Sequence, residues 1–237
     1  PVAAGDFARR ARAAVADFAA QGYLPLLVGG TGLYFRAIAG GLAPIPSVPT
    51  AVRQDVRRQW DSLGPAAMHA RLTAVDPAYA AKIAQNDRQR VTRALEVFTA
   101  TGKPLSAWHR EPDPEAPDYD SLTLGLGLPL ADLAPRLAVR IEAMVRAGAV
   151  EEVRQALETY PETVPGLSGI GGPELSGFLA GRLDLEAAKA AWLANTRAYA
   201  KRQMTWFRKE PDIQWFAPGE HQVLLEVVRA WLDRSAA

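Results

Sequence analysis

Apolar residues in the first forty positions follow two different spacings. Residues 6–22 carry apolar side chains at helical spacing, with an Asp at the start and a Gly at the end. Residues 23–28 form a continuous apolar run between turn residues, which is typical of a strand covered on both faces of a parallel sheet. A Gly-rich turn at 29–31 follows, and helical spacing resumes over 33–39. This order predicts an α/β fold.

Two proline-rich stretches, 42–49 and 111–118, bracket a part of the chain with helical patterns alone. Those patterns cover 52–63, 66–75, 77–84 and 87–100. Beyond the second stretch the sequence predicts strands at 121–128 and 213–216, and helices over 130–147, 150–159, 172–180, 185–209 and 223–232. We therefore expect an α/β core built from residues 1–46 and 119–237, with residues 47–118 as an all-helical insertion.

The composition narrows the possible functions. Of the 237 residues, 49% are hydrophobic and 22% are charged, which is enough apolar material for a folded core. Lys and Arg total 27 against 26 Asp and Glu, so binding of nucleic acid by bulk charge is excluded while local basic patches are not. The absence of Cys excludes disulfides, zinc–thiolate sites and thiol nucleophiles. No apolar run approaches the ~20 residues that span a bilayer, and we expect a cytoplasmic protein.

The turn at 29–31 is the first candidate site. It follows the expected strand, at the sheet edge where ligands bind in open α/β folds. Gly29 and Gly30 allow close approach of a ligand to the backbone, and Thr31 adds a hydroxyl at a helix N-terminus. The same residues also fit an ordinary strand-to-helix turn in which Thr31 caps the helix.

Two helices carry clusters of basic residues. At the start of 87–100, Gln89, Arg93 and Glu96 share a face and Arg90 lies beside it, so guanidinium groups could hold phosphates while an amide contacts a base. The segment 196–209 has five basic residues and no acidic one. Such a ridge suits a diphosphate at one end and a polynucleotide backbone at the other. Either cluster is also compatible with a solvated helix face. The three histidines are isolated, and no metal site is predicted from them.

Several motifs together closely resemble the tRNA dimethylallyltransferase (isopentenyltransferase) family, in the family's order and over nearly the whole chain. They are the segments 25–34, 76–77, 86–87 with Arg90, 93–97 and 101–106, the residues Arg136, Arg140, Met144 and Gly148, and the segment 196–197 with 201–206. The resemblance implies a catalytic core with a parallel sheet flanked by helices, like that of P-loop kinases, and a helical insertion that clamps the tRNA anticodon stem-loop. It also implies transfer of a dimethylallyl group from dimethylallyl diphosphate to N6 of the adenosine next to the anticodon, with Mg²⁺, by a monomer.

The resemblance assigns roles to individual residues. Thr31 is implied to lie against the target adenine in the reaction channel, as a catalytic and tRNA-contacting residue. The implied tRNA contacts are Arg53, Gln89, Arg90, Val91, Thr92 and Arg93. The implied phosphate contacts are Arg197, Lys201 and Arg202.

The sequence also departs from the family pattern. The family's phosphate loop and its general-base Asp lie upstream of the segments seen here, and no G-x-x-x-x-G-K-[ST] pattern occurs in these residues. We therefore expect a core incomplete at its N-terminus, with the Mg²⁺ ligands mainly in that segment and the chain inactive by itself. Gly172 and Pro173 stand where the family has an aromatic and then a basic residue. Two alternatives stay open: a non-catalytic tRNA-binding remnant, and a small-molecule phosphotransferase related to P-loop kinases.

Overall fold

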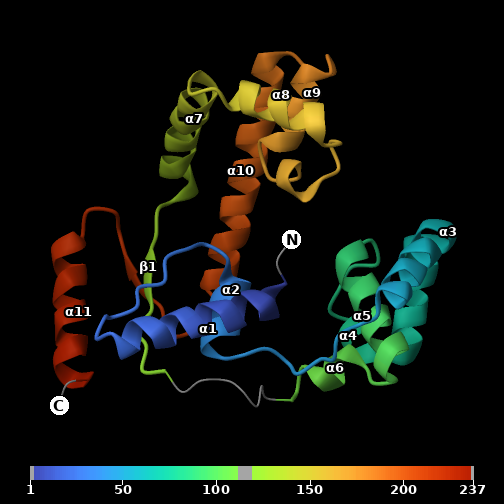
Figure 1. The fold of residues 1–237 in the computed structure, drawn as a ribbon, viewed down its shortest axis with the longest axis horizontal. Helices are drawn as coiled ribbons and strands as arrows, with labels where there is room; N and C mark the ends of the chain where they lie inside the picture. The colour runs from blue at the N-terminus through green and yellow to red at the C-terminus, as the bar shows by residue number, and fades with distance from the viewer. Residues whose placement is uncertain (1–2, 112–118, 236–237) are drawn as a thin grey trace. The chain divides into compact units, whose positions relative to one another are not determined.

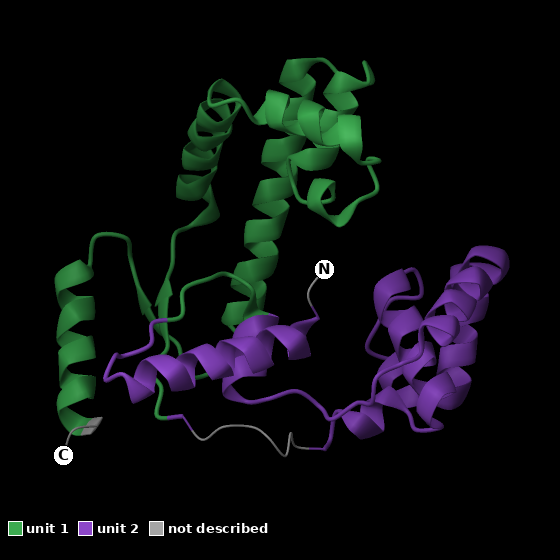
Figure 2. Cartoon of the chain, in the orientation of Figure 1, with its two compact units in different colours: residues 1, 27–32, 120–237 green, residues 2–26, 33–119 purple. Residues whose placement is uncertain are grey.

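The computed structural model describes residues 3–111 and 119–235, and these form two compact units (Figures 1 and 2). Among these residues, unit 1 comprises 27–32 and 120–235, and unit 2 comprises 3–26, 33–111 and 119. The structure is a helix-rich α/β arrangement with a small parallel sheet. The boundaries at 46/47 and 118/119 expected from the proline-rich stretches stay a prediction.

Unit 2 contains two separate apolar cores. The first joins α1 (Ala4–Ala20) to α2 (Gly32–Ala39) around Ala8, Ala37 and Ile38. The Arg12 guanidinium donates to the carbonyls of Ala37 at 2.8 Å and Ile38 at 3.2 Å. Because the last carbonyls of a helix have no partner within it, these bonds fix the C-terminal end of α2 against α1.

The second core of unit 2 lies among four helices: α3 (Thr50–Val75), α4 (Pro77–Ala80), α5 (Arg88–Thr101) and α6 (Leu105–Trp108). Its fully buried side chains include Met68, Leu72, Val91 and Val97. Within α3 the backbone departs from helical geometry at Gly64, whose φ is 78°, and Pro65 follows. The two helical patterns predicted on either side of this point are therefore confirmed as two segments of one kinked helix.

Unit 1 contains the sheet, in which β1 (Leu124–Leu126) pairs in parallel with β2 (Gln214–Phe216). Both strands were predicted from the sequence, and both are confirmed as shorter elements. Gly125 lies opposite Trp215, and a Cβ at Gly125 would come within 2.7 Å of the Trp215 ring, so this position needs Gly. The accompanying helices are α7 (Leu130–Arg146), α8 (Ala149–Thr159), η1 (Pro165–Leu167), α9 (Gly172–Leu179), α10 (Leu185–Phe207) and α11 (His221–Ser235).

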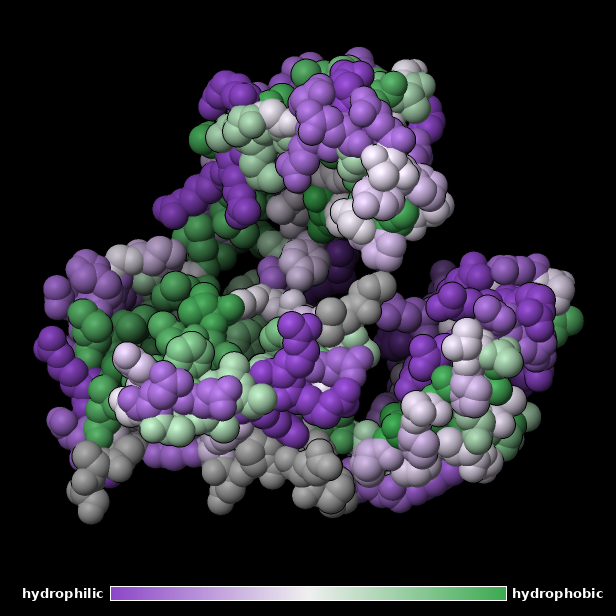
Figure 3. All heavy atoms as spheres, viewed as in Figure 1, coloured by the Kyte–Doolittle hydropathy of each residue, from purple (hydrophilic) through white to green (hydrophobic). Residues whose placement is uncertain are grey.

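The strand predicted over 23–28 is wrong. This segment has no regular secondary structure, and it pairs with neither β1 nor β2, the strands of the described sheet. Its apolar side chains are exposed, with Leu26 at 84% and Val28 at 87% of their accessible surface. An apolar run predicts burial, but a strand also needs a neighbour that accepts its backbone hydrogen bonds. In unit 1, Figure 3 shows apolar side chains on the surface around β1, where Leu126 is 68% exposed.

Each helix predicted within residues 3–111 and 119–235 is present; most boundaries shift by one to three residues, and the helix predicted over 77–84 is shorter, because α4 ends at Ala80. None of the helices in residues 3–111 and 119–235 combines the length and the apolar character needed to cross a bilayer.

Candidate functional site

The N-terminus of α5 is fixed by Asp87. One carboxylate oxygen accepts from the Arg90 backbone N–H at 3.0 Å, and the other accepts from Arg90 Nε at 2.6 Å. The side-chain hydrogen bond from Arg90 lowers the pKa of Asp87 below its ordinary value. Asp87 therefore stays ionised, and it holds both the first turn of α5 and the guanidinium of Arg90.

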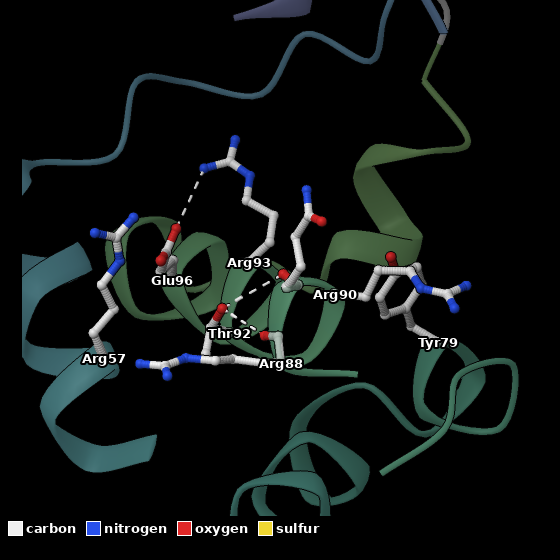
Figure 4. Close-up of a pocket in the computed structure, with 8 residues that line it drawn as sticks. Arg57, Tyr79, Arg88, Arg90, Thr92, Arg93 and Glu96 are labelled. Carbon is white, nitrogen blue, oxygen red and sulfur yellow. Dashed lines mark hydrogen bonds and ion pairs between the residues drawn. The ribbon is translucent and has the colours of Figure 1, made fainter. Parts of the chain in front are cut away.

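A groove of about 620 Å³ opens along this end of α5 (Figure 4). The side chains that line it come from three helices of unit 2: Arg57 of α3, Tyr79 of α4, and Arg88, Gln89, Arg90, Thr92, Arg93 and Glu96 of α5. Four guanidinium groups thus surround one cavity. This arrangement is suited to a phosphate-bearing ligand, because planar guanidinium groups donate paired hydrogen bonds to phosphate oxygens.

The four arginines differ in how strongly acidic neighbours engage them. Arg90 is held by Asp87, and Arg88 pairs with Asp61 at 2.9 Å. Arg93 lies 3.8 Å from Glu96, which is too far for a hydrogen bond. Arg57 is exposed and forms no ion pair within the described part of the chain. Arg57 and Arg93 are therefore the guanidinium groups most available to a ligand.

The structure brings four of the six predicted tRNA-contacting residues of unit 2 to the groove: Gln89, Arg90, Thr92 and Arg93. The Thr92 hydroxyl donates to the Arg88 carbonyl at 2.7 Å, so it is engaged within the helix. Val91 is fully buried in the core, so its side chain faces away from the groove. Arg53 is exposed on the first turn of α3 and does not line the groove. No local sequence signal singles out Arg57 or Tyr79, because tertiary packing places them there.

Tyr79 supplies the aromatic wall of the groove. Burial raises the pKa of its phenol above the ordinary value of 10.0, so the ring is neutral at physiological pH. The ring packs edge-on against His109, with centroids 5.7 Å apart. Burial also lowers the pKa of His109 below its ordinary value of 6.5; the charge of Asp76 opposes this effect and that of Lys82 adds to it.

We expect this neutral His109 to make unit 2 less stable in mild acid. Well above its ordinary pKa of 6.5, His109 is neutral in the folded and the unfolded chain. As the pH falls below 6.5, the unfolded chain binds the proton more readily, so the free energy of unfolding decreases until the folded form is protonated too. Thermal unfolding at about pH 7.5 and about pH 5.5 measures this loss. His109→Gln has no titrating group and should reduce the difference; an unchanged difference would contradict the prediction.

A second set of predicted residues lies in unit 1, where the turn at 29–31 packs on α10. Gln203 Nε2 donates to the Gly30 carbonyl at 2.7 Å. A Cβ at Gly32 would lie 2.0 Å from the Trp206 ring, so the backbone approaches α10 more closely than any other residue type allows. Thr31 is exposed between these two contacts. The structure thus ties the turn that carries Thr31 to the predicted basic helix.

The three predicted phosphate-contacting residues of α10 do not all face this turn. Arg197, Lys201 and Arg202 are exposed. At 3.6 residues per turn, Arg202 lies about 40° from Trp206 around the helix axis, Lys201 about 140° and Arg197 about 180°. Arg202 also lies over the ring of Tyr199, 5.7 Å from its centroid. Of the three cations, Arg202 therefore flanks the turn that carries Thr31.

The segment at 168–174 is also fixed in place. A Cβ at Gly172 would meet the Leu167 carbonyl oxygen at 2.2 Å, so a larger residue there would force the backbone to move. Glu174 accepts from the Gly171 N–H at 2.8 Å and from Asn195 Nδ2 of α10 at 2.6 Å. Gly172 is thus required by close backbone packing in this chain.

The described residues do not supply a metal site of their own. No group of three or more His, Asp or Glu side chains within 3–111 and 119–235 is arranged to hold a metal ion. Mg²⁺ is usually held by one or two carboxylates together with substrate phosphates and water, so the Mg²⁺ that the sequence resemblance implies stays a prediction.

Comparison with known proteins gives consistent similarities. A family model described as IPP transferase matches residues 1–210. The tRNA dimethylallyltransferase of Maridesulfovibrio salexigens is 48% identical over 217 residues, covering 91% of this chain and 71% of that protein. The tRNA dimethylallyltransferase of Nitratidesulfovibrio vulgaris (strain DP4) is 48% identical over 236 residues, covering 99% of this chain and 76% of that protein.

Two solved structures are similar in fold as well. The full-length tRNA isopentenylpyrophosphate transferase from Bacillus halodurans superposes with a TM-score of 0.64 at 28% identity, covering 99% of this chain and 75% of that one. A eukaryotic dimethylallyltransferase described as acting on tRNA gives a TM-score of 0.73 at 27% identity, covering 91% of this chain and 56% of that one.

Proposed function

The chain belongs to the IPP transferase family, and from this we propose that it transfers a dimethylallyl group to tRNA. The structural observation that carries the proposal is the packing of the Thr31 turn on basic helix α10, through Gln203 and the close approach of Gly32 to Trp206. In finer detail, the acceptor is N6 of the adenosine next to the anticodon, the donor is dimethylallyl diphosphate, and the protein acts as a cytoplasmic monomer built on a P-loop-kinase-like sheet with a helical insertion.

The chemistry of this transfer explains the residues near the turn. A bond forms between N6 and the first carbon of the dimethylallyl group, while the bond from that carbon to the diphosphate oxygen breaks and its electron pair leaves with the diphosphate. N6 gives up a proton to water. Because its lone pair is delocalised into the ring, N6 is a poor nucleophile, so the leaving group must be stabilised by nearby cations. Arg202 supplies such a cation beside Thr31.

The target adenine must also leave its stack to react, as for other enzymes that act on a base. The surrounding RNA therefore has to be held while one nucleotide is displaced. The groove of unit 2 offers guanidinium groups for the phosphates and the Tyr79 ring for stacking. We assign the groove to RNA binding and the Thr31 turn to the transfer.

Mass spectrometry of an anticodon stem-loop RNA tests the proposal. Incubation with dimethylallyl diphosphate, Mg²⁺ and a longer form of the protein that also carries the family's phosphate loop and general-base Asp should add one dimethylallyl group to the RNA, whereas residues 1–237 alone are expected to bind the RNA without transfer. The matched control RNA carries inosine in place of the target adenosine, and it should stay unmodified because it lacks the N6 amine. Salt-dependent RNA binding without transfer by that longer form would favour the non-catalytic remnant instead. The matching family favours prenyl transfer over a small-molecule phosphotransferase.

We expect Arg93→Ala to weaken RNA binding more than Arg90→Ala. Arg93 has no hydrogen-bonded acidic partner, whereas Arg90 is already engaged by Asp87. Loss of one phosphate contact should reduce the slope of log affinity against log salt concentration by about 1. Fluorescence anisotropy of labelled stem-loop RNA over a salt series measures both variants. Equal affinities and slopes for the two variants would contradict this ranking.

A further inference from the structure

One acidic side chain lies within the otherwise basic groove of unit 2. Glu96 is only 6% exposed, yet it lines the cavity. Its carboxylate forms no hydrogen bond with any described residue, and its nearest cation is Arg93, 3.8 Å away. In Figure 4 the carboxylate is seen between the guanidinium groups of Arg57 and Arg93. Burying a charge without hydrogen bonds is costly, so the carboxylate has acceptor capacity that the folded chain leaves unused.

The charges of the groove are arranged by depth. At the margin, the side chains of Arg88, Arg90 and Arg93 are 42–56% exposed. The Glu96 side chain is 8% exposed and therefore lies deeper. A phosphate would be attracted by the margin and repelled by the carboxylate beneath it. A nucleotide would therefore enter with its base inward and its phosphate outward. The half-buried ring of Tyr79 offers a surface on which that base could stack.

The carboxylate also discriminates between bases. Carboxylates accept hydrogen bonds from an exocyclic amine such as the N4 amino group of cytosine. Uracil has a carbonyl oxygen at the same position, and this oxygen would face the carboxylate with like partial charge. Cytosine and uracil thus have the same size. They differ in that cytosine carries a hydrogen-bond donor at this position and uracil an acceptor.

We propose that Glu96 determines the specificity of this groove for an RNA base with an exocyclic amino group, which donates a hydrogen bond to the carboxylate. The inference rests on the proposed function, because it takes the ligand of the groove to be RNA. It goes further by assigning base selection to an acidic residue within a phosphate-binding surface.

Glu96→Gln tests the role of the carboxylate while keeping the shape of the side chain. If the groove attracted RNA by charge alone, removing a negative charge would tighten binding. Base selection predicts the opposite: binding of the anticodon stem-loop should weaken about tenfold. In the wild-type chain, short oligocytidylate should bind more tightly than oligouridylate of equal length, and Glu96→Gln should abolish this preference.

Two control variants complete the experiment. Glu111→Gln removes a charge from the same unit outside the groove and should keep the preference for cytosine. Arg93→Ala should weaken both oligonucleotides equally, because both present the same phosphates. Tighter or unchanged binding by Glu96→Gln, or equal binding of the two oligonucleotides by the wild-type chain, would overturn the role of Glu96 even if transfer occurs. Absence of transfer and of stem-loop binding would instead overturn the proposed function, while the oligonucleotide comparison would still decide the role of Glu96.

Discussion

Replacing Asp76 by Ala is expected to destabilise unit 2 by about 3–5 kcal/mol. Asp76 is 2% exposed and accepts two backbone hydrogen bonds, one on each carboxylate oxygen. The Tyr79 N–H donates to one oxygen at 3.1 Å, and the Ser106 N–H donates to the other at 2.8 Å. The first bond caps α4 and the second ties the start of α6 to it, so alanine would leave two amides without their partner. Chemical denaturation followed by circular dichroism measures the change.

Asp76→Asn serves as the matched control. Its side chain has the same shape but only one acceptor oxygen, so one of the two amides would face an NH₂ group. We expect its loss of stability to lie between those of the wild type and Asp76→Ala. If both variants unfolded at the wild-type denaturant concentration, the carboxylate would not be what connects α4 to α6. Because Tyr79 lines the groove, the alanine variant should also bind RNA more weakly.

The sequence predicted the helices of this fold well because each carries its own local signals. Asp87, for example, stands directly before helical apolar spacing, and it caps α5 in the structure. The strands β1 and β2 were each predicted from a short apolar run, whereas their pairing is seen only in the structure. The strand predicted at 23–28 is not formed, although the segment is a continuous apolar run. A strand depends on a hydrogen-bonding neighbour, and the pattern of one segment carries no information about that neighbour.

The candidate sites could be predicted only in part, for a similar reason. The cluster at the start of α5 was visible because Gln89, Arg90 and Arg93 lie within two helical turns of one another. Arg57 and Tyr79 join it from other helices, and nothing in their local sequence indicates this. The depth of Glu96 likewise follows from packing of α5 on α3 rather than from its position on the predicted face.

Arg202→Ala is expected to reduce the rate of dimethylallyl transfer by about 10²-fold, the usual effect of removing one group that stabilises charge developing on the leaving group. Arg202 lies on the side of α10 that holds the Thr31 turn, next to the residues that contact Gly30 and Gly32. If the adenine lies against Thr31, the departing diphosphate acquires its charge within reach of this guanidinium. Single-turnover kinetics with saturating RNA and dimethylallyl diphosphate measure the rate of the transfer step itself.

Lys201→Ala is the matched comparison, because it removes a positive charge from the adjacent position of the same helix. Lys201 lies about 140° from Trp206 around α10, away from the Thr31 turn, and we expect it to contact phosphates of the RNA. Its loss should therefore raise KM for tRNA and reduce the salt dependence of binding, with a much smaller effect on the single-turnover rate. Equal losses of rate in the two variants would mean that α10 acts through its total charge. A larger loss for Lys201→Ala would place the diphosphate on the opposite face of the helix from Thr31, and the assignment of the transfer to the Thr31 turn would then fail.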